Sequence, residues 1–279
     1  MAAPTLVLWG ARALYVGPAL GLGAHRSAVA VVAVGLGGPF GVARDPDAPP
    51  DEPHDGRDGA EALRWCRTAV IPPRTRHRLH ATGVMAFVYL DALARDLADV
   101  LDRAGARDAP DGVLRAAYDL ADEAAVVRLL ADAANGVTPW PSSCARLAAL
   151  LGLTPARPPD PRVADAARRL RADPGGCPPL AGMARAAGLS PARFARRFTA
   201  AAGVPFRRYR LWCRMAAVAR AAAAGAPLTR AALDTGFASS AHLSAAFRAM
   251  FGLSPTRLAL GRLTLVDLGD DRPADGPHC

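Results

Sequence analysis

The chain has 279 residues, of which 51% are hydrophobic and 21% charged, and its formal net charge at pH 7 is +9. This composition is that of a folded globular protein and excludes a disordered one, and the length suits about two domains. No apolar run approaches the roughly 20 residues that span a bilayer, and the N-terminus lacks a basic segment that leads into an apolar one. We therefore expect a cytoplasmic protein with no membrane partner.

Five short stretches rich in β-branched and aromatic residues predict strands near the N-terminus. Gly and Pro residues separate these stretches, which read TLVLWG, ALYVG, AVAVVAVGLGG, TAVIPP and VMAFVYLD. Such spacing is typical of a compact antiparallel sandwich or barrel. We therefore expect a β-rich sensor domain over residues 1–90, with an acidic surface loop over residues 45–59.

Residues 91–153 are expected to be helical, because DALARDLADVLDRAG and DGVLRAAYDLADEAAVVRLLADAANG place apolar residues at helical spacing. One face of the second helix is a candidate homodimer seam, and packing inside its own domain is an equal alternative. Residues 154–159 contain three prolines, which predict a semi-rigid linker. The seam would comprise Val113, Leu114, Ala117, Leu120 and Ala121.

The positive charge is concentrated in residues 160–262. All 34 basic residues are arginines, and this segment holds 17 of them with four aspartates and no glutamate. The rest of the chain has more acidic than basic residues. A basic domain joined to a mildly acidic one indicates a polyanionic partner, although charge alone does not separate DNA from RNA or an anionic membrane.

One helical pattern occurs twice in this basic segment. LAGMARAAG ends at Gly188, and Ser190-Pro191 begin the next helix, which is the outline of a helix-turn-helix. The pattern of residues 180–203 recurs over 228–252, with one residue added in the turn. PFRRYRLWCRMAAVARAAAAG lies between the copies and predicts a helix of about 19 residues. With its flanking turns, this helix would place two recognition helices near the ~34 Å that separates successive major grooves on one DNA face.

Three stretches of this segment resemble the DNA-binding domain of the AraC/XylS transcription regulators. They are GLSPARFARRF, YRLWCRMAAVARAAAAG and GFASSAHLSAAFRAMFGLSP. The resemblance implies an all-α domain over residues 160–262, with two helix-turn-helix motifs that bind double-stranded DNA. VIPPRTRHRL, residues 70–79, resembles the cupin-like sensor domains that often precede this domain. The expected fold class is therefore α+β, with an N-terminal cupin-like barrel or sandwich and a flexible tail over residues 263–279.

The resemblance also implies DNA-contacting residues on both recognition helices. Many relatives have a long polar or basic residue where this chain has Ala245, and alanine offers only apolar contact, for instance to a thymine methyl. Arg248 and the helix cap near Ser239 suit phosphates better, so the second motif is expected to position the domain more than it specifies bases. The implied residues are Ala192, Arg193 and Arg196 on the first helix, and Ser240, Ala241, His242, Ala245 and Arg248 on the second.

These assignments have alternatives. An arginine on a basic helix contacts phosphate or solvent more often than a base edge, and His242 would otherwise cap its helix or pack against a neighbour. His25, His77 and His80 could be remnants of a cupin metal site, but the sequence has no H-x-H followed by a carboxylate at ligand spacing, so we expect no metal or other cofactor. The expected core residues are Phe194, Phe198, Trp212, Leu243 and Phe247.

The function that these features predict is sequence-specific DNA binding by a transcription regulator, controlled by a small-molecule effector in the N-terminal domain. RNA polymerase and a second copy of the chain are further candidate partners. The chain has no nucleophile-elbow, P-loop or dinucleotide fingerprint, so we do not expect an enzyme. The alternatives are a metal-dependent cupin enzyme fused to a DNA-binding domain, and an architectural DNA binder with little sequence preference.

Overall fold

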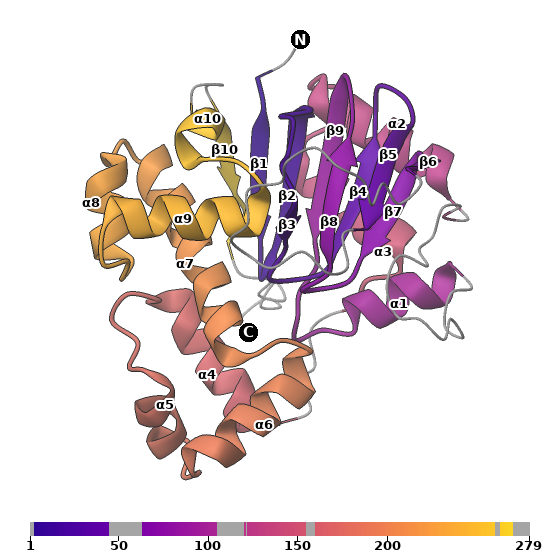
Figure 1. Cartoon of the computed structure of the whole chain (residues 1–279). Coiled ribbons are helices and arrows are strands. Elements are labelled where there is room, and N and C mark those ends of the chain that lie inside the picture. The colour runs from indigo at the N-terminus through magenta and orange to yellow at the C-terminus, as the bar shows by residue number, and fades with distance from the viewer. Residues whose placement is uncertain are drawn as a thin grey trace, which may run out of the picture.

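The computed structural model describes residues 3–44, 63–104, 120, 122–154, 160–259 and 263–269. A sheet domain formed mainly by the N-terminal part of the chain lies beside a helical domain formed by the C-terminal part (Figure 1). This arrangement confirms the predicted α+β fold class. The predicted acidic loop over residues 45–59 lies outside the described residues.

The sheet domain is a sandwich of two sheets. Alternate residues of each strand point to opposite faces, so Met85 and Phe87 face the smaller sheet while Ala86 and Val88 face the other way. The larger sheet has the order β10-β1-β2-β9-β4-β7, in which β10 is Thr264–Asp267, and the smaller one has the order β3-β8-β5-β6. The first strands are β1 (Thr5–Trp9), β2 (Arg12–Pro18), β3 (His25–Arg26), β4 (Val31–Gly35) and β5 (Phe40–Arg44), and the next are β6 (Arg64–Cys66), β7 (Thr68–Ile71), β8 (Arg76–His80) and β9 (Val84–Tyr89).

The smaller sheet is the part of the sandwich that the sequence did not predict. Strand β8 buries His77 and Leu79, whereas Arg78 and His80 are exposed on the outer side. Three of its five residues are thus charged or polar and face outward, which hides the strand from a search for apolar runs. The five predicted strands are β1, β2, β4, β7 and β9.

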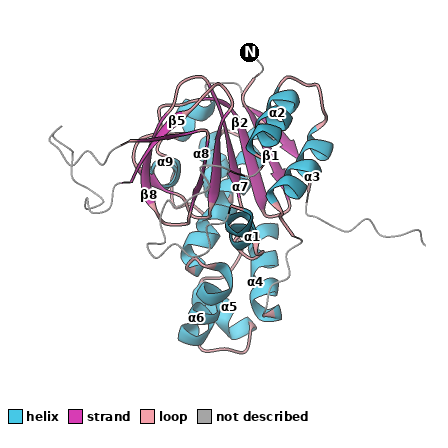
Figure 2. Ribbon diagram, turned by 90° about the vertical axis from the view of Figure 1, so that its right-hand side faces the viewer, coloured by secondary structure: helices cyan, strands magenta, loops and turns pink. Residues whose placement is uncertain are grey.

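Three helices cover the face of the larger sheet that points away from the sandwich core (Figure 2). They are α1 (Asp96–Arg103), α2 (Glu123–Ala134) and α3 (Trp140–Leu151). Leu120, one residue of the predicted homodimer seam, is buried in this core and packs inside its own domain. The other four seam residues lie outside the described part of the chain.

The prediction of a flexible C-terminal tail is wrong for residues 264–267. They form β10 (Thr264–Asp267), which pairs in parallel with β1, so that Thr5 lies opposite Thr264 and Leu8 opposite Asp267. Asp267 also forms an ion pair with Arg220 at 2.6 Å. The chain therefore returns from the helical domain to the edge of the larger sheet and joins the two domains a second time.

The helical domain contains the two predicted helix-turn-helix motifs. Asp160 caps the first helix by accepting a hydrogen bond from the backbone N–H of Arg162 at 3.0 Å, and Pro161 occupies the first turn. The connecting helix α7 has 18 residues and is about 27 Å long. The helices are α4 (Pro161–Ala172), α5 (Leu180–Ala186), α6 (Pro191–Ala202), α7 (Phe206–Ala223), α8 (Leu228–Asp234), α9 (Ser240–Phe251) and α10 (Pro255–Ala259).

Each motif is packed against the sheet domain. Leu93, which follows β9, is buried in the core of the first motif with Phe194 and Phe198. Ala28 and Val29, between β3 and β4, share a core with Trp212 and the second motif. The backbone N–H of Gly23 donates to the carbonyl of Gly252, the C-terminal cap of α9, at 2.9 Å. The domains are thus joined by apolar cores as well as by the segment between them.

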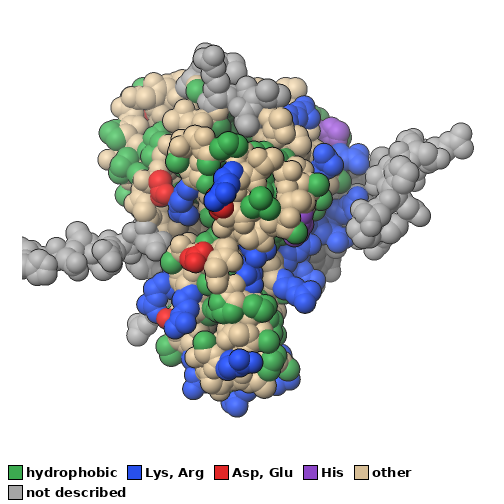
Figure 3. Space-filling view, turned by 90° about the vertical axis from the view of Figure 1, so that its left-hand side faces the viewer, with side chains coloured by type: hydrophobic (Ala, Val, Ile, Leu, Met, Phe, Trp, Pro, Cys, Tyr) green, Lys and Arg blue, Asp and Glu red, His purple; other side chains and the backbone are tan. Residues whose placement is uncertain are grey.

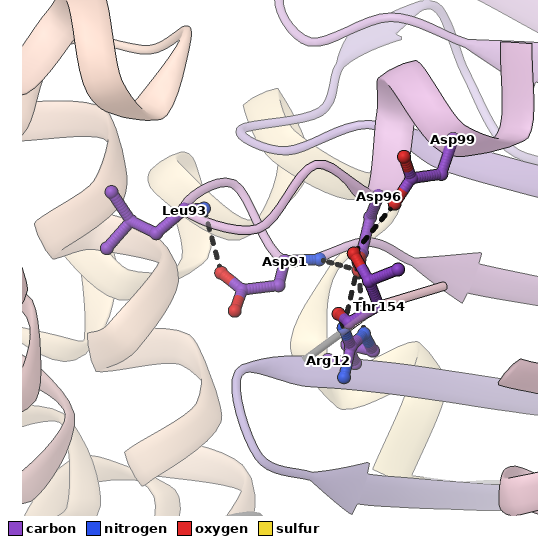
Figure 4. A network of polar contacts seen from close by, with 6 residues as sticks. All are labelled: Arg12, Asp91, Leu93, Asp96, Asp99 and Thr154. Carbon is purple, nitrogen blue, oxygen red and sulfur yellow. Dashed lines mark hydrogen bonds and ion pairs between the residues drawn. The ribbon is translucent and has the colours of Figure 1, made fainter. Parts of the chain in front are cut away.

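A buried polar network fixes the chain where it leaves the sheet domain (Figure 4). The Arg12 guanidinium donates to both carboxylate oxygens of Asp96, at 2.6 and 2.8 Å, and also to the carbonyl of Thr154. Asp96 in turn accepts from the backbone N–H of Asp91, and Asp91 accepts from that of Leu93. Burial raises the pKa of Asp91 above its usual value. The network therefore connects β2, α1 and the segment that carries Leu93 into the helical domain.

Candidate DNA-binding surface and ligand cavity

The first motif is formed by α5 and α6. Gly188 between them has a φ of 65°, a left-handed conformation that favours glycine. Ser190 then caps α6 by accepting a hydrogen bond from the backbone N–H of Arg193 at 3.3 Å. Phe194 and Phe198 are fully buried, and both rings contact Phe206 of α7 edge to face, which holds α6 on the connecting helix.

The outer face of α6 carries the residues that were predicted to meet DNA. Ala192, Arg193 and Arg196 are all exposed, on the side of the helix opposite Phe194 and Phe198. Arg197, the next residue, is instead engaged in an ion pair with Asp160 at 2.6 Å. The arginines of α6 thus divide into exposed ones and one that ties α6 to the start of α4.

The second motif is formed by α8 and α9. Ser239 caps α9 by accepting from the backbone N–H of His242 at 3.1 Å. Leu243 is fully buried, as predicted, and Ser240 is half-buried. The outer face of α9 exposes Ala241, His242, Ala245 and Arg248.

His242 stabilises the start of its own helix. Its ring Nδ1 accepts a hydrogen bond from the backbone N–H of Ala238 at 3.3 Å, and the ring packs edge-on against Phe237 at 5.4 Å. The sequence left capping or packing open for His242 as an alternative to a DNA contact, and these contacts are of that kind. A neutral ring that accepts at Nδ1 has its proton on Nε2, which is thus a donor.

The recognition helices lie on one side of the molecule. Figure 1 draws α9 across the upper part of α7, with β3 and β8 beside it, and α6 below the lower end of α7. In the space-filling view, basic side chains gather along one edge, from the helical part up along the sheet part, and acidic side chains lie away from that edge (Figure 3). The surface on this side is suited to a polyanion.

The three histidines that were weighed as metal ligands do not converge. His25 and His77 are buried on paired strands, with ring centroids 4.2 Å apart, but His80 is exposed. The Nδ1 atoms of His25 and His77 are hydrogen-bonded to the carbonyls of Gly23 and Thr75, respectively. Burial lowers the pKa of both rings, that of His77 to about 3. Within the described residues, no group of three His, Cys, Asp or Glu side chains could hold a metal ion.

An apolar cavity of about 310 Å³ lies between the two domains. One wall consists of residues from β1, β2 and β9, and the other of residues from α7, α9 and α10. None of the described residues that line it is charged. The Tyr15 hydroxyl donates to the carbonyl of Pro18 at 3.1 Å, and burial raises the pKa of Tyr15 to about 12, so this side chain is neutral.

The sequence had no signal for this cavity, because its walls come from segments about 200 residues apart. For the same reason, the prediction for Phe247 was incomplete. It was predicted to be a core residue, but it is only partly buried and lines the cavity together with Phe251 and Trp212.

Comparison with known proteins agrees with this architecture. Residues 183–260 match the model of a helix-turn-helix domain family. The crystal structure of ToxT from Vibrio cholerae O395 superposes with a TM-score of 0.55 and 10% sequence identity, over 90% of this chain and 98% of ToxT. No curated protein matches the chain by sequence.

Two further structures of ToxT contain a bound acid. The O395 protein bound to (E)-4-(8-methylnaphthalen-1-yl)but-3-enoic acid has a TM-score of 0.53 and 11% identity, over 90% of this chain and 98% of that one. Unsaturated fatty acid bound wild-type ToxT from strain SCE256 has a TM-score of 0.51 and 8% identity, over 88% and 93%. At such identities the likeness shows the fold alone.

The matched domain, the two capped motifs on one connecting helix and the sheet domain beside them define a DNA-binding transcription regulator. The double motif within residues 183–260 is a helix-turn-helix of the AraC type. None of the described helices has both the length and the apolar character needed to cross a membrane.

Proposed function

We propose that the chain binds a specific DNA site by placing α6 and α9 in successive major grooves, and that this binding regulates transcription. The observation that carries the proposal is the exposure of both recognition faces on one side of a single rigid helix, α7. RNA polymerase and a second copy of the chain are proposed as further partners, since a regulator acts at promoters. We propose that the chain works in the cytoplasm, where such a regulator meets DNA.

Arg196 is proposed to read a base and Arg248 to bind a phosphate. Replacing Arg196 with alanine is expected to cost about 1–3 kcal/mol on the preferred site and to relax one base position. Arg248→Ala is expected to weaken binding to all sequences alike and to lower the salt slope of binding by about one. Selection of bound sites from random DNA by the full-length variants measures both effects. Equal losses with no change in base preference would contradict this division of roles.

We further propose that the cavity between the domains holds the effector. A ligand there touches walls from both domains, so it can favour one arrangement of the recognition helices over another. By thermodynamic linkage, DNA and ligand then change each other's affinity by the same factor. Support comes from the cavity's volume, which falls at the lower end of the range for small-molecule sites.

The lining suggests an effector that has no charge inside the cavity. The ToxT structures hold acids, but the described lining of this cavity offers no cation to a carboxylate, and burial of an unpaired charge is costly. We therefore expect dodecan-1-ol to bind at least tenfold more tightly than dodecanoate at pH 7, in calorimetric titrations of the full chain. Tighter binding of the acid would contradict this ligand class.

A matched pair of variants tests the location. Ala219→Phe places a large ring into the cavity and is expected to abolish dodecanol binding. Ala124→Phe adds the same ring at an exposed position of α2, which contributes no residue to the lining, and should leave binding unchanged. If both variants bind the alcohol as the parent does, the cavity is not the ligand site.

A further inference from the structure

Three arginines from both domains meet beside the recognition helices. Arg26 lies on β3, Arg74 in the turn between β7 and β8, and Arg208 in the first turn of α7. The backbone N–H of Arg74 donates to the carbonyl of Ser27 at 3.0 Å, which holds this turn against β3. We refer to Arg26, Arg74 and Arg208 as the junction cluster.

Packing between the domains explains why Arg208 joins the other two. Trp212, one helical turn after Arg208, lies on the face of α7 that packs against Ala28 and Val29. Arg208 therefore points to the same side of the helix, toward the strand that carries Arg26. The positive charges of Arg26 and Arg74, after burial, are the causes that lower the pKa of Arg208.

The junction cluster has no counter-charge among the described residues. None of its three side chains forms an ion pair or a hydrogen bond there, whereas Arg12, Arg197 and Arg220 are each paired with an aspartate. Three guanidinium groups held together repel one another unless an anion lies between them. Arginine side chains of this kind are well suited to phosphate oxygens, which they bind through two parallel hydrogen bonds.

The position of the cluster indicates which anion it meets. Strand β3 packs against α9, and Arg208 begins the helix that follows α6, so the cluster lies between the ends of the two recognition helices. All of these elements face the same side of the molecule (Figures 1 and 2). Basic side chains there continue from the helical part onto the sheet part (Figure 3).

We propose that the junction cluster binds phosphates of the DNA duplex held by α6 and α9, so that the sheet domain takes part directly in DNA binding. This inference rests on the DNA binding proposed above. The sequence placed the charge for DNA in residues 160–262, and Arg26 and Arg74 add two arginines to that surface from the other domain. A change in the arrangement of the two domains would then break phosphate contacts, which gives an effector in the cavity a direct means of altering DNA affinity.

The test is the salt dependence of binding by the full chain. A triple variant, Arg26→Gln, Arg74→Gln and Arg208→Gln, is measured against a duplex selected from random DNA by the parent protein. Each lost phosphate contact lowers the slope of log affinity against log salt by about 0.9, so we expect a decrease of about 2 to 3 with no change in base preference. Arg128→Gln changes an exposed arginine of α2, at the other side of the larger sheet, and should leave the salt slope unchanged. The matched single variants Arg26→Gln and Arg74→Gln should each lower that slope by about 0.9.

Folding and the source of the anion are checked separately. The melting temperature of the triple variant should equal or exceed that of the parent, since a repulsion is removed. The proposal is overturned if the triple variant and the parent have the same salt slope. If, in addition, inorganic phosphate raises the melting temperature of the parent but not that of the triple variant, the cluster is a site for free anions and not for DNA. If the parent itself binds no duplex, the proposed function fails instead.

Discussion

Replacing Asp96 with alanine is expected to lower the free energy of unfolding by about 3–5 kcal/mol. Asp96 is fully buried and accepts three hydrogen bonds, two from Arg12 and one from the backbone of Asp91 (Figure 4). Without the carboxylate, the buried guanidinium of Arg12 loses the two hydrogen bonds that it donates to Asp96. Chemical denaturation of the full chain, followed by circular dichroism, measures the loss.

Two further variants separate the buried pair from ordinary surface charge. Asp165→Ala removes a carboxylate that pairs with Arg168 and Arg169 on the surface, and it should cost less than about 1 kcal/mol. Substitution of both Arg12 and Asp96 by leucine should recover part of the lost stability, because apolar side chains then replace both members of the buried ion pair. If Asp96→Ala lowers the free energy of unfolding no more than Asp165→Ala does, the buried network around Asp96 does not stabilise the contact between the two domains.

The parts of the fold that could be predicted from sequence are those with local signals. Glycine in a turn, a capping serine and apolar residues at helical spacing identified α5, α6, α8 and α9, because each feature acts within a few residues. The strands rich in valine were predicted for the same reason. The exposed faces of α6 and α9 follow from the buried positions of Phe194 and Leu243 alone.

The parts that could not be predicted depend on contacts between distant segments. Strand β10 is four residues long and forms only because β1 offers a free edge about 260 residues earlier. The cavity and the junction cluster each combine residues from both domains, and Arg26 and Arg208 are 182 positions apart. The sequence implied a DNA contact for His242 and left a capping role open, and only the structure shows its hydrogen bond from Ala238.

Truncation of Leu93 to alanine is expected to destabilise the helical DNA-binding domain, although Leu93 belongs to the sheet domain. Leu93 is 4% exposed and fills the core around Phe194 and Phe198, although it belongs to the segment that follows β9. Removal of a buried leucine side chain costs about 2–5 kcal/mol, because a cavity remains. Fragment 158–262 lacks this residue altogether, so we expect it to unfold more easily than the same helices in the full chain.

Leu233→Ala is the matched control for this prediction, because Leu233 lies in the helical domain but is 56% exposed. Its truncation should change the unfolding free energy by less than about 0.5 kcal/mol. Denaturation of both full-length variants, together with DNA binding, distinguishes a core contact from a surface one. Leu93→Ala should also weaken DNA binding, since α6 packs on the same core. If Leu93→Ala and Leu233→Ala were equally stable, the first motif would complete its core without the sheet domain, and the domains would be joined less tightly than their packing indicates.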